Sequence, residues 1–292
     1  MELFRGLEHV VREQEPLAPY TWFRLGGDAE YFSEPTSRDE LLELVRRCHE
    51  QEIPVRLLGG GSNLLVRDAG VPGLVIHLSA PAFAEIKVDG SRLIAGGGAK
   101  LSHVISTAVR EGLAGLEPLV GIPGTVGGAL HGNAGTQHGD VGQRTLQAVV
   151  MTRAAEVIER SADDLRFAYR QSSLDELAIL EATFQLEPED ASELTKRMQT
   201  QWIIKKAAQP TAGLNTGCIF ADPPGADATS LIEQAGLRSV SRGGARLSGE
   251  NANFIVVSGE ATSDDVLDLI EKLRSGVAER VGVELEADIE IW

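Results

Sequence analysis

The sequence is short of the residues that several classes of protein need. Of its 292 residues only two are cysteine, Cys48 and Cys218, which is too few for a disulfide framework and fits a reducing compartment. No apolar run approaches the ~20 residues that a membrane span requires. The first residues also lack the basic flank and apolar core of a signal peptide. We therefore expect a cytoplasmic protein with no membrane partner.

Positive charge is scarce as well. The chain has 27 Lys and Arg against 43 Asp and Glu, a formal net charge of −16. Binding to nucleic acid depends on clustered Lys and Arg, so we expect no nucleic-acid partner. A small anionic substrate is compatible with this charge, because two or three local cations suffice to bind one. We predict no metal site and a monomer.

Glycine, by contrast, is concentrated in two loops, residues 58–64 (LGGGSNL) and 121–129 (GIPGTVGGA). Glycine permits positive φ and leaves backbone N–H groups uncovered, so such loops can hold a bulky anion without using charge. Neither loop is a complete Rossmann fingerprint or a P-loop. Most glycine-rich stretches are merely tight turns, but a run as specific as the second favours a site for cofactor phosphates. The candidate residues are Gly59, Gly60, Gly61, Ser62, Asn63, Gly121, Ile122, Gly124, Thr125, Gly127 and Gly128.

The pattern of apolar residues predicts three successive units. In the first, a capping box at residues 37–40 opens a helix that places Cys48 in the core, and β-type runs follow at 53–58, 64–66 and 74–78. The second is predicted to contain a hairpin over 85–95, a helix over 104–109, strands at 146–152, 156–159 and 177–186, and a helix over 190–209. The third has helices at 229–235 and 264–280, a strand at 253–257 and an alternating run from 283 to a strand at 291–292. We place the domains at 1–79, 80–206 and 207–292.

Three distant segments carry candidates for chemistry: Arg170 after Tyr169, Cys218 after Gly217, and Asp288 near the C-terminus. A cation, a proton donor and a carboxylate are the parts needed to polarise a carboxylate-bearing substrate and to protonate a carbanion. Each residue also has an ordinary structural interpretation. Arg170 could form a surface salt bridge, Cys218 could be a small buried hydrophobe, and Asp288 could be a charge at a strand edge.

Motifs along almost the whole chain resemble the UDP-N-acetylenolpyruvoylglucosamine reductase family of flavoenzymes. They are TWFRLGG at 21–27, LGGGSNLLV at 58–66, GLE at 115–117, GIPGTVGGA at 121–129, NAG at 133–135, YR at 169–170, QP at 209–210, ANF at 252–254 and LE at 285–286. The short spacing between Tyr169-Arg170 and Gly217-Cys218 is similar to that of the compact subtype of the family.

The resemblance implies an α+β, three-domain flavoprotein. Its two-domain FAD-binding module, of the PCMH/VAO (vanillyl-alcohol oxidase) type, would bind FAD non-covalently and hold the diphosphate on the two glycine loops. A C-terminal α/β domain would close over UDP-N-acetylglucosamine enolpyruvate. NADPH would reduce the flavin, whose N5 would pass hydride to the enolpyruvyl methylene carbon. The product would be UDP-N-acetylmuramate, a precursor of peptidoglycan.

The resemblance also implies roles for single residues. Arg170 matches the arginine that steadies the enolate carboxylate, Cys218 stands where the family usually has a serine proton donor, and Asp288 stands where it usually has a glutamate. Lys206 matches a lysine that contacts the substrate diphosphate. The remaining residues predicted to bind substrate are Tyr169, Asp222 and Asn251.

Departures from the family pattern keep two alternatives open. The family usually has Lys-Asn where this chain has Ala221-Asp222, and His where it has Asn251. The changes at positions 221, 222 and 288 allow a paralogue that binds FAD but has lost or altered its substrate specificity. A second alternative is an FAD-dependent oxidase on the same scaffold, because such enzymes often tether the flavin through a residue such as His131 beside a glycine loop. A lone histidine there is more often an ordinary polar contact.

Overall fold

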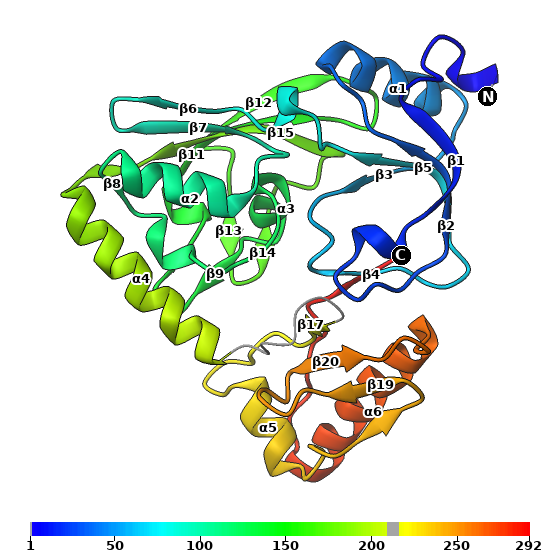
Figure 1. The fold of residues 1–292 in the computed structure, drawn as a ribbon, viewed down its shortest axis with the longest axis vertical. Coiled ribbons are helices and arrows are strands. Elements are labelled where there is room, and N and C mark those ends of the chain that lie inside the picture. The colour runs from blue at the N-terminus through cyan, green and yellow to red at the C-terminus, as the bar shows by residue number, and fades with distance from the viewer. Residues whose placement is uncertain (1, 209–215) are drawn as a thin grey trace. The chain divides into compact units, whose positions relative to one another are not determined.

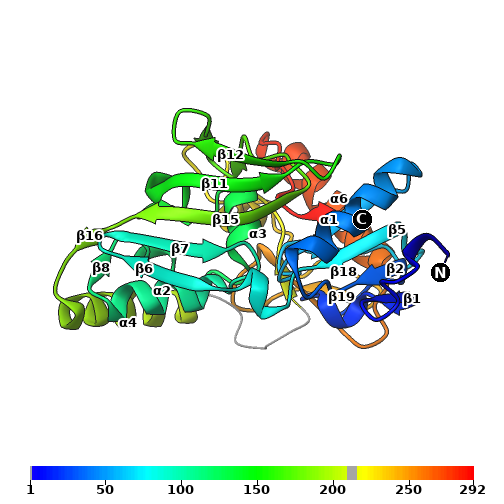
Figure 2. The same ribbon diagram turned by 90° about the horizontal axis from the view of Figure 1, so that it is seen from above.

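A five-stranded antiparallel sheet, in the order β12-β11-β15-β7-β6, organises the larger part of the chain in the computed structural model, which describes residues 2–208 and 216–292. Figure 2 shows these strands side by side. Their bounds are β6 (Ile86–Asp89), β7 (Arg92–Gly96), β11 (Thr145–Met151), β12 (Val157–Ser161) and β15 (Ala178–Gln185). The predicted hairpin is confirmed: β6 and β7 turn at Gly90, whose φ of 59° suits glycine.

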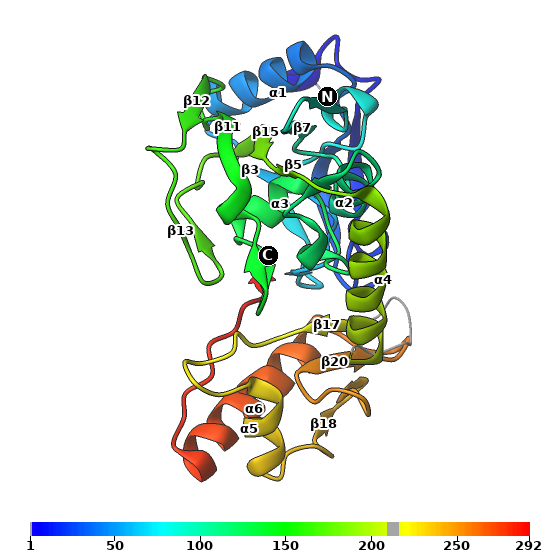
Figure 3. The same cartoon turned by 90° about the vertical axis from the view of Figure 1, so that its left-hand side faces the viewer.

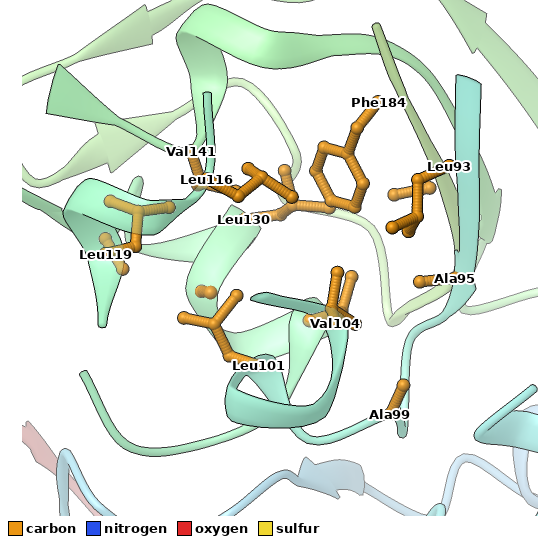
Figure 4. Close-up of a cluster of buried hydrophobic side chains, with 14 of the residues drawn as sticks. Leu93, Ala95, Ala99, Leu101, Val104, Leu116, Leu119, Leu130, Val141 and Phe184 are labelled. Atoms are coloured by element: carbon orange, nitrogen blue, oxygen red, sulfur yellow. The ribbon is translucent and has the colours of Figure 1, made fainter. Parts of the chain in front are cut away.

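Helices α2 (Leu101–Arg110) and α3 (Val126–His131) contribute to the core that packs on this sheet. Figure 4 shows Phe184 of β15 and Leu93 of β7 close to Val104 of α2 and Leu130 of α3. All four side chains are fully buried. The apolar face of α2 is therefore buried as predicted. Helix α3, by contrast, begins within the second glycine loop, where no helix was predicted.

A second sheet, in the order β1-β2-β5-β3, is formed by β1 (Val11–Pro16), β2 (Asp28–Ser33), β3 (Val55–Leu58) and β5 (Val71–His77). Helix α1 (Arg38–Glu50) begins after Ser37, whose hydroxyl accepts the Glu40 N–H. One face of α1 is buried, and Cys48 lies on it with no exposed surface. The prediction of a capped helix with a core thiol is confirmed.

Helix α4 (Ala191–Ala208) carries an ion pair to a residue that lies just before the second glycine loop. Arg197 bonds the buried carboxylate of Glu117 at 2.8 Å and binds Glu189 through both terminal nitrogens. Glu117 in turn accepts the Gly115 N–H and begins the 3₁₀ helix Glu117–Leu119, directly before the loop at 121–129. The sequence predicted the helix but not this attachment.

The smaller unit has a four-stranded antiparallel sheet in the order β17-β20-β19-β18, with α5 and α6 packed together beside it (Figure 3). The elements are β17 (Thr216–Cys218), α5 (Ala228–Gln234), β18 (Ser241–Arg242), β19 (Ala245–Leu247), β20 (Phe254–Val257) and α6 (Ser263–Val281). Strand β21 (Glu290–Ile291) pairs in parallel with β4 (Leu64–Leu65). Residues 283–286 form no strand, so the alternation there was misleading.

Short elements complete the chain, and several of them are labelled in Figure 1. They are the strands β8 (Leu113–Ala114), β9 (Gly135–Thr136), β10 (Gly139–Asp140), β13 (Phe167–Ala168), β14 (Gln171–Ser172) and β16 (Glu187–Pro188), and the 3₁₀ helices Glu2–Phe4, Ala18–Tyr20, Pro81–Phe83 and Gly142–Arg144. No helix in the described part of the chain has both the length and the apolar composition to cross a bilayer.

The two compact units are discontinuous in sequence. The larger comprises Met1–Glu15, Glu30–Gly60 and Pro72–Ile204, and the smaller comprises Pro16–Ala29, Gly61–Val71 and Lys205–Trp292. The expected boundary near residue 206 thus lies close to a change of unit, but two early segments belong with the C-terminal residues. The division of the larger unit at 79/80 stays a prediction.

Candidate functional site

The two glycine loops meet backbone to backbone within the larger unit. A Cβ placed on Gly60 would lie 2.7 Å from the Cα of Gly124, and one placed on Gly59 would lie 2.9 Å from Oγ1 of Thr125. Contacts this short leave no room for a side chain on either glycine. The loops are therefore brought together as a site for one shared anion would require, and glycine is needed where they touch.

Backbone geometry in the second loop explains its other glycines. Gly121 and Gly124 have φ values of 82° and 106°, which side-chain-bearing residues rarely adopt. Ile122 is half-buried against the core, and Thr125 begins α3 by accepting the Gly128 N–H at 3.4 Å. The Gly127 N–H donates to the Gly97 carbonyl at 2.8 Å, so this amide is occupied by the fold. Gly127 can therefore contribute to a ligand site only by leaving space where another residue would have a side chain.

The later residues of the first loop belong to the smaller unit. Gly61 has a φ of 62°, and a Cβ there would lie 2.0 Å from the Tyr20 carbonyl oxygen. Ser62 is half-buried, and Asn63 is exposed. The Asn63 side-chain amide donates to the Asp288 carbonyl at 2.7 Å, and the Asn63 carbonyl accepts the Glu290 N–H at 3.0 Å. The Asn63 amide thus holds the C-terminal segment, so its predicted contact with a cofactor rests on its backbone.

Tyr169 and Arg170 form the two-residue turn of the hairpin between β13 and β14. Arg170 is half-buried and adopts a left-handed φ of 58°. Tyr169 is 59% exposed, and the guanidinium carbon of Arg170 lies 5.7 Å from the centre of its ring. The hairpin was not predicted, because two-residue strands are too short to show a periodic pattern.

Cys218 and Asp288 lie on neighbouring backbone segments of the smaller unit. Cys218 ends β17 with an exposed thiol, so the interpretation of a buried hydrophobe is wrong. Directly after it, Ile219 accepts the Asp288 N–H at 2.8 Å and Ala221 donates to the Glu286 carbonyl at 3.0 Å. Asp288 is half-buried. Backbone hydrogen bonds thus join the two segments that carry Cys218 and Asp288, which are 70 positions apart in sequence.

Asp222 and Asn251, both predicted to bind substrate, make contacts that fix α5. Oδ1 of Asp222 accepts the N–H of Ala228, the first residue of α5, at 2.9 Å. Oδ1 of Asn251 accepts the Thr229 hydroxyl at 2.8 Å and the Asn253 N–H at 2.9 Å. The carboxylate at position 222 therefore has a local structural use, because negative charge near a helix N-terminus is stabilising.

Two further predicted positions lie near or outside the limit of what the structure describes. Lys206 is exposed on the last turn of α4. The Gln209-Pro210 motif that follows lies outside the described residues.

His131, the residue considered as a flavin attachment point, directs Nδ1 at the Leu174 carbonyl, 3.0 Å away, which is the ordinary polar contact expected of it.

Sequence reasoning assigned no role to Asn133 and Asn253, although both lie in motifs singled out for their resemblance. Each is more than nine-tenths buried, with exposed fractions of 3% and 6%. Each directs its amide at backbone close to Arg170 or Cys218. The signal in the sequence was a lone asparagine within a specific motif, which on its own does not show what the side chain contacts.

Comparisons with known proteins place the chain among flavoenzymes. Residues 29–160 match the model of the FAD binding domain, and residues 209–292 match that of the UDP-N-acetylenolpyruvoylglucosamine reductase, C-terminal domain. The chain is 39% identical over 98% of its length to the UDP-N-acetylenolpyruvoylglucosamine reductase of Rhodopirellula baltica, covering 94% of that protein. It is 42% identical over 97% of its length to UDP-N-acetylenolpyruvoylglucosamine reductase 2 of Symbiobacterium thermophilum, covering 92% of it.

Two solved structures extend the comparison. The crystal structure of UDP-N-acetylenolpyruvylglucosamine reductase from Thermus caldophilus is 35% identical, with a TM-score of 0.83 over 97% of this chain and 99% of that one. The 6-hydroxy-D-nicotine oxidase of Arthrobacter nicotinovorans is 15% identical, with a TM-score of 0.59 over 96% of this chain and 85% of that one. The second likeness shows a shared fold alone.

Proposed function

Because the chain belongs to the UDP-N-acetylenolpyruvoylglucosamine reductase family, we propose that it catalyses the NADPH-dependent, FAD-mediated reduction of UDP-N-acetylglucosamine enolpyruvate to UDP-N-acetylmuramate. It is a flavin-dependent oxidoreductase with the α+β fold of FAD-binding proteins and a C-terminal domain typical of the family. The observation that best supports this reaction at residue level is the exposed Cys218 thiol beside the backbone of Asp288.

The glycine loops have the features that FAD requires. A Cβ on Gly60 would meet the backbone of Gly124, so the two loops approach each other through bare backbone of the kind that holds phosphate groups. We assign the diphosphate to Gly59, Gly60 and Gly61 with Ser62 and Asn63 from the first loop, and to Gly121, Ile122, Gly124, Thr125, Gly127 and Gly128 from the second. FAD, when bound, supplies the hydride that reaches the methylene carbon of the enolpyruvyl group.

The protein's own residues then handle charge and the proton. Cys218 donates a proton to the carbon beside the carboxylate, and a thiol can do so because a free thiol has a reference pKa of about 8.5 and is mostly protonated at neutral pH. Arg170 stabilises the negative charge that develops on the substrate carboxylate. Asp288, together with Arg170, is assigned to hold the developing enolate.

Lys206 and Tyr169 are assigned to the rest of the substrate. Lys206 supplies positive charge to the substrate diphosphate, which matters more here because Ala221 replaces the usual lysine. Both side chains are exposed to solvent. Asp222 and Asn251 support this site by holding α5 through hydrogen bonds. We also assign them to substrate binding, which would come in addition to these structural contacts.

The test separates the two half-reactions by stopped-flow absorbance. Replacing Cys218 with Ala should slow re-oxidation of the reduced flavin by enolpyruvyl substrate about 10²–10⁴-fold, the usual worth of a general acid. Reduction by NADPH should stay near normal, and Cys218→Ser should retain a substantial share of the rate. A Cys218→Ala protein with a normal oxidative half-reaction would exclude Cys218 as the donor.

The same experiment decides between the alternatives on the unaltered protein. Re-oxidation by substrate supports the reductase, whereas re-oxidation by oxygen alone supports an oxidase on this scaffold. Absence of reduction by NADPH supports the paralogue with altered specificity, which the changes at positions 221, 222 and 288 suggest. The likeness to an oxidase is one of fold, so the reductase is the function we favour.

We further propose that the protein acts as a monomer in the cytoplasm, without a nucleic-acid or membrane partner. The cysteine content supports a reducing compartment, because two cysteines are too few for a disulfide framework. The net charge of −16 opposes binding to polyanions. Size-exclusion chromatography with light scattering would test the monomer directly, and a mass of twice 31.2 kDa would contradict it.

A further inference from the structure

The hairpin that carries Arg170 is held by the side chain of Asn133. The Asn133 Nδ2 donates to the Ala168 carbonyl, two residues before Arg170, at 2.7 Å, while its Oδ1 accepts the Gly142 N–H at 3.1 Å. Asn133 is 3% exposed and follows α3 with a left-handed φ of 42°. A side-chain amide can donate to one peptide group and accept from another, so Asn133 ties the hairpin to the backbone beyond α3.

Arg170 needs such support because its own backbone is strained. It occupies the second position of a two-residue turn with a φ of 58°, where glycine is the residue without steric cost. A second contact holds the other strand of the hairpin, since the Ser172 hydroxyl donates to the His131 carbonyl at 2.8 Å. Strain of this kind persists only where the surroundings fix the conformation.

Cys218 has a comparable neighbour in Asn253. The Asn253 Nδ2 donates to the Phe220 carbonyl at 2.8 Å, and its Oδ1 accepts the Phe220 N–H at 3.0 Å. One amide side chain thus satisfies both polar groups of a residue two positions after Cys218. Phe220 is buried, and those polar groups would otherwise be costly to leave unpaired.

Asp288 is held directly. The Asn63 Nδ2 donates to the Asp288 carbonyl at 2.7 Å, and the Asn63 main chain accepts the N–H of Glu290. The side chain of Asn63, in the first glycine loop, thereby fixes the backbone of Asp288, which carries the proposed catalytic carboxylate.

We propose that Asn63, Asn133 and Asn253 are positioning residues, each fixing the backbone that presents one of the three proposed catalytic side chains. This inference rests on the proposed function, since it takes Arg170, Cys218 and Asp288 as the catalytic set. The pairing is one to one: Asn133 acts through Arg170, Asn253 through Cys218 and Asn63 through Asp288. Precise placement has a large effect, because a misplacement of about 1 Å can cost roughly 10²-fold in rate.

The test replaces each asparagine by aspartate, which has the same shape and keeps the acceptor oxygen but cannot donate to the carbonyl. We expect N133D to slow re-oxidation of the flavin by enolpyruvyl substrate by roughly 10²-fold, with reduction by NADPH unchanged. N63D should slow the same oxidative half-reaction to a similar extent. N63D is exposed and therefore keeps the experiment informative if a buried aspartate at 133 or 253 prevents folding. FAD content is measured for each variant from its visible spectrum.

A double-mutant cycle separates positioning from general damage. If Asn133 acts through Arg170, N133D should cost less than about threefold in a protein that already carries R170A, because coupled residues are non-additive. Q185E is the matched control. The side-chain amide of Gln185, on β15, also donates a hydrogen bond to a backbone carbonyl, that of Leu186. Removing this donor should leave the rates of both half-reactions unchanged.

Three outcomes decide the matter. The inference is supported if N133D and N63D slow the oxidative half-reaction and if the effect of N133D on that rate becomes small in the R170A protein. Wild-type rates in both N63D and N133D, or an N133D effect of full size in the R170A protein, would overturn the inference and leave the proposed function intact. An unaltered protein that substrate fails to re-oxidise would overturn the proposed function, and this inference with it.

Discussion

The two cysteines show how one residue type takes opposite roles in this chain. Cys48 lies on the buried face of α1, and desolvation by burial raises its pKa to about 11. Cys218 ends a strand with its thiol exposed. A thiol reacts as the thiolate, so access and pKa together make Cys48 inert and leave Cys218 available.

Thiol labelling measures this difference. We expect a coloured disulfide reagent at pH 8 to modify one cysteine in the native protein and two after denaturation. The Cys218→Ala variant should then show none until it unfolds. Rapid labelling of Cys48 in the folded protein would contradict the burial of α1.

At the level of single residues, the proposed roles in the site stay predictions, and the contacts of those residues could not be predicted from the sequence. Resemblance singled out Arg170, Cys218 and Asp288, and backbone hydrogen bonds join the two segments that carry the last two. The partner of Asp222 could not be predicted, because it depends on where α5 begins. The hydrogen bonds of Asn133 were equally hidden, since they join segments 35 positions apart.

Helix α1 provides a pH-dependent element. Two hydrogen bonds lower the pKa of Glu40 from 4.5 to about 2: the larger effect comes from the backbone N–H of Thr36 and the next from the side chain of His9. Because the pKa is lower in the folded state, the ionised form stabilises the fold above about pH 4.5. That contribution is lost as the pH falls from about 4.5 towards 2.

Replacing Glu40 with Gln tests this element. The variant should have a lower free energy of unfolding at pH 7, and the difference from the unaltered protein should shrink steadily as acid is added. Urea unfolding at several pH values measures it. A difference that is the same at pH 7 and pH 2.5 would show that the carboxylate charge is not the cause.

Helix α3 offers a clean test of the cofactor loop. Gly128 lies in helical backbone, and a Cβ there would be 3.6 Å from Oγ1 of Thr125, an ordinary contact. Gly128→Ala should therefore fold at least as well, since Ala favours helix by about 1 kcal/mol. If its exposed face meets FAD, affinity should fall about tenfold or more, measured by flavin fluorescence.

Gly132, at the other end of α3, is the matched control for that experiment. A Cβ there would lie 3.8 Å from the Gly128 carbonyl oxygen, so Gly132→Ala is also tolerated, and FAD affinity should not change. Equal effects of both substitutions would argue against the loop assignment. Gly124 is less suitable, because its φ of 106° would add strain to any side chain placed there.

At the scale of elements, long periodic segments were predicted well and short ones were not. The apolar stripes of α1, α2 and α6 and the Asp89-Gly90 turn are strong local signals. Residues 283–286 alternate as a strand would, yet they find no partner strand within the described part of the chain. Alternation of apolar and polar residues indicates only which side chains are buried, whereas strand formation also depends on pairing with residues that are distant in sequence.

At the scale of the whole molecule, the sequence led us to expect three consecutive domains. The structure shows two compact units whose segments alternate along the chain, with residues 16–29 and 61–71 belonging to the C-terminal one. Composition changes little across these boundaries, because each segment is short and contributes strands or turns of ordinary character. The mixed α+β class was nevertheless correct.

Binding of FAD should stabilise this arrangement. A ligand that binds the folded state at about 100 times its Kd adds about 2.7 kcal/mol to the free energy of unfolding. We expect FAD to raise the Tm of the flavin-free protein by several degrees in calorimetry. The rise should be smaller for Gly128→Ala at the same FAD concentration, and an identical rise would contradict weaker binding by that variant.

The pairing of β21 with β4 has a consequence for biosynthesis. The bond from Asn63 to Asp288 joins residues 225 positions apart, so the first glycine loop emerges from the ribosome long before its partner is made. The larger unit can begin to fold during translation, whereas the smaller one must wait for the last strand. Until then the early segments 16–29 and 61–71 have no completed core to join, and this is the interval in which chaperones would find them exposed.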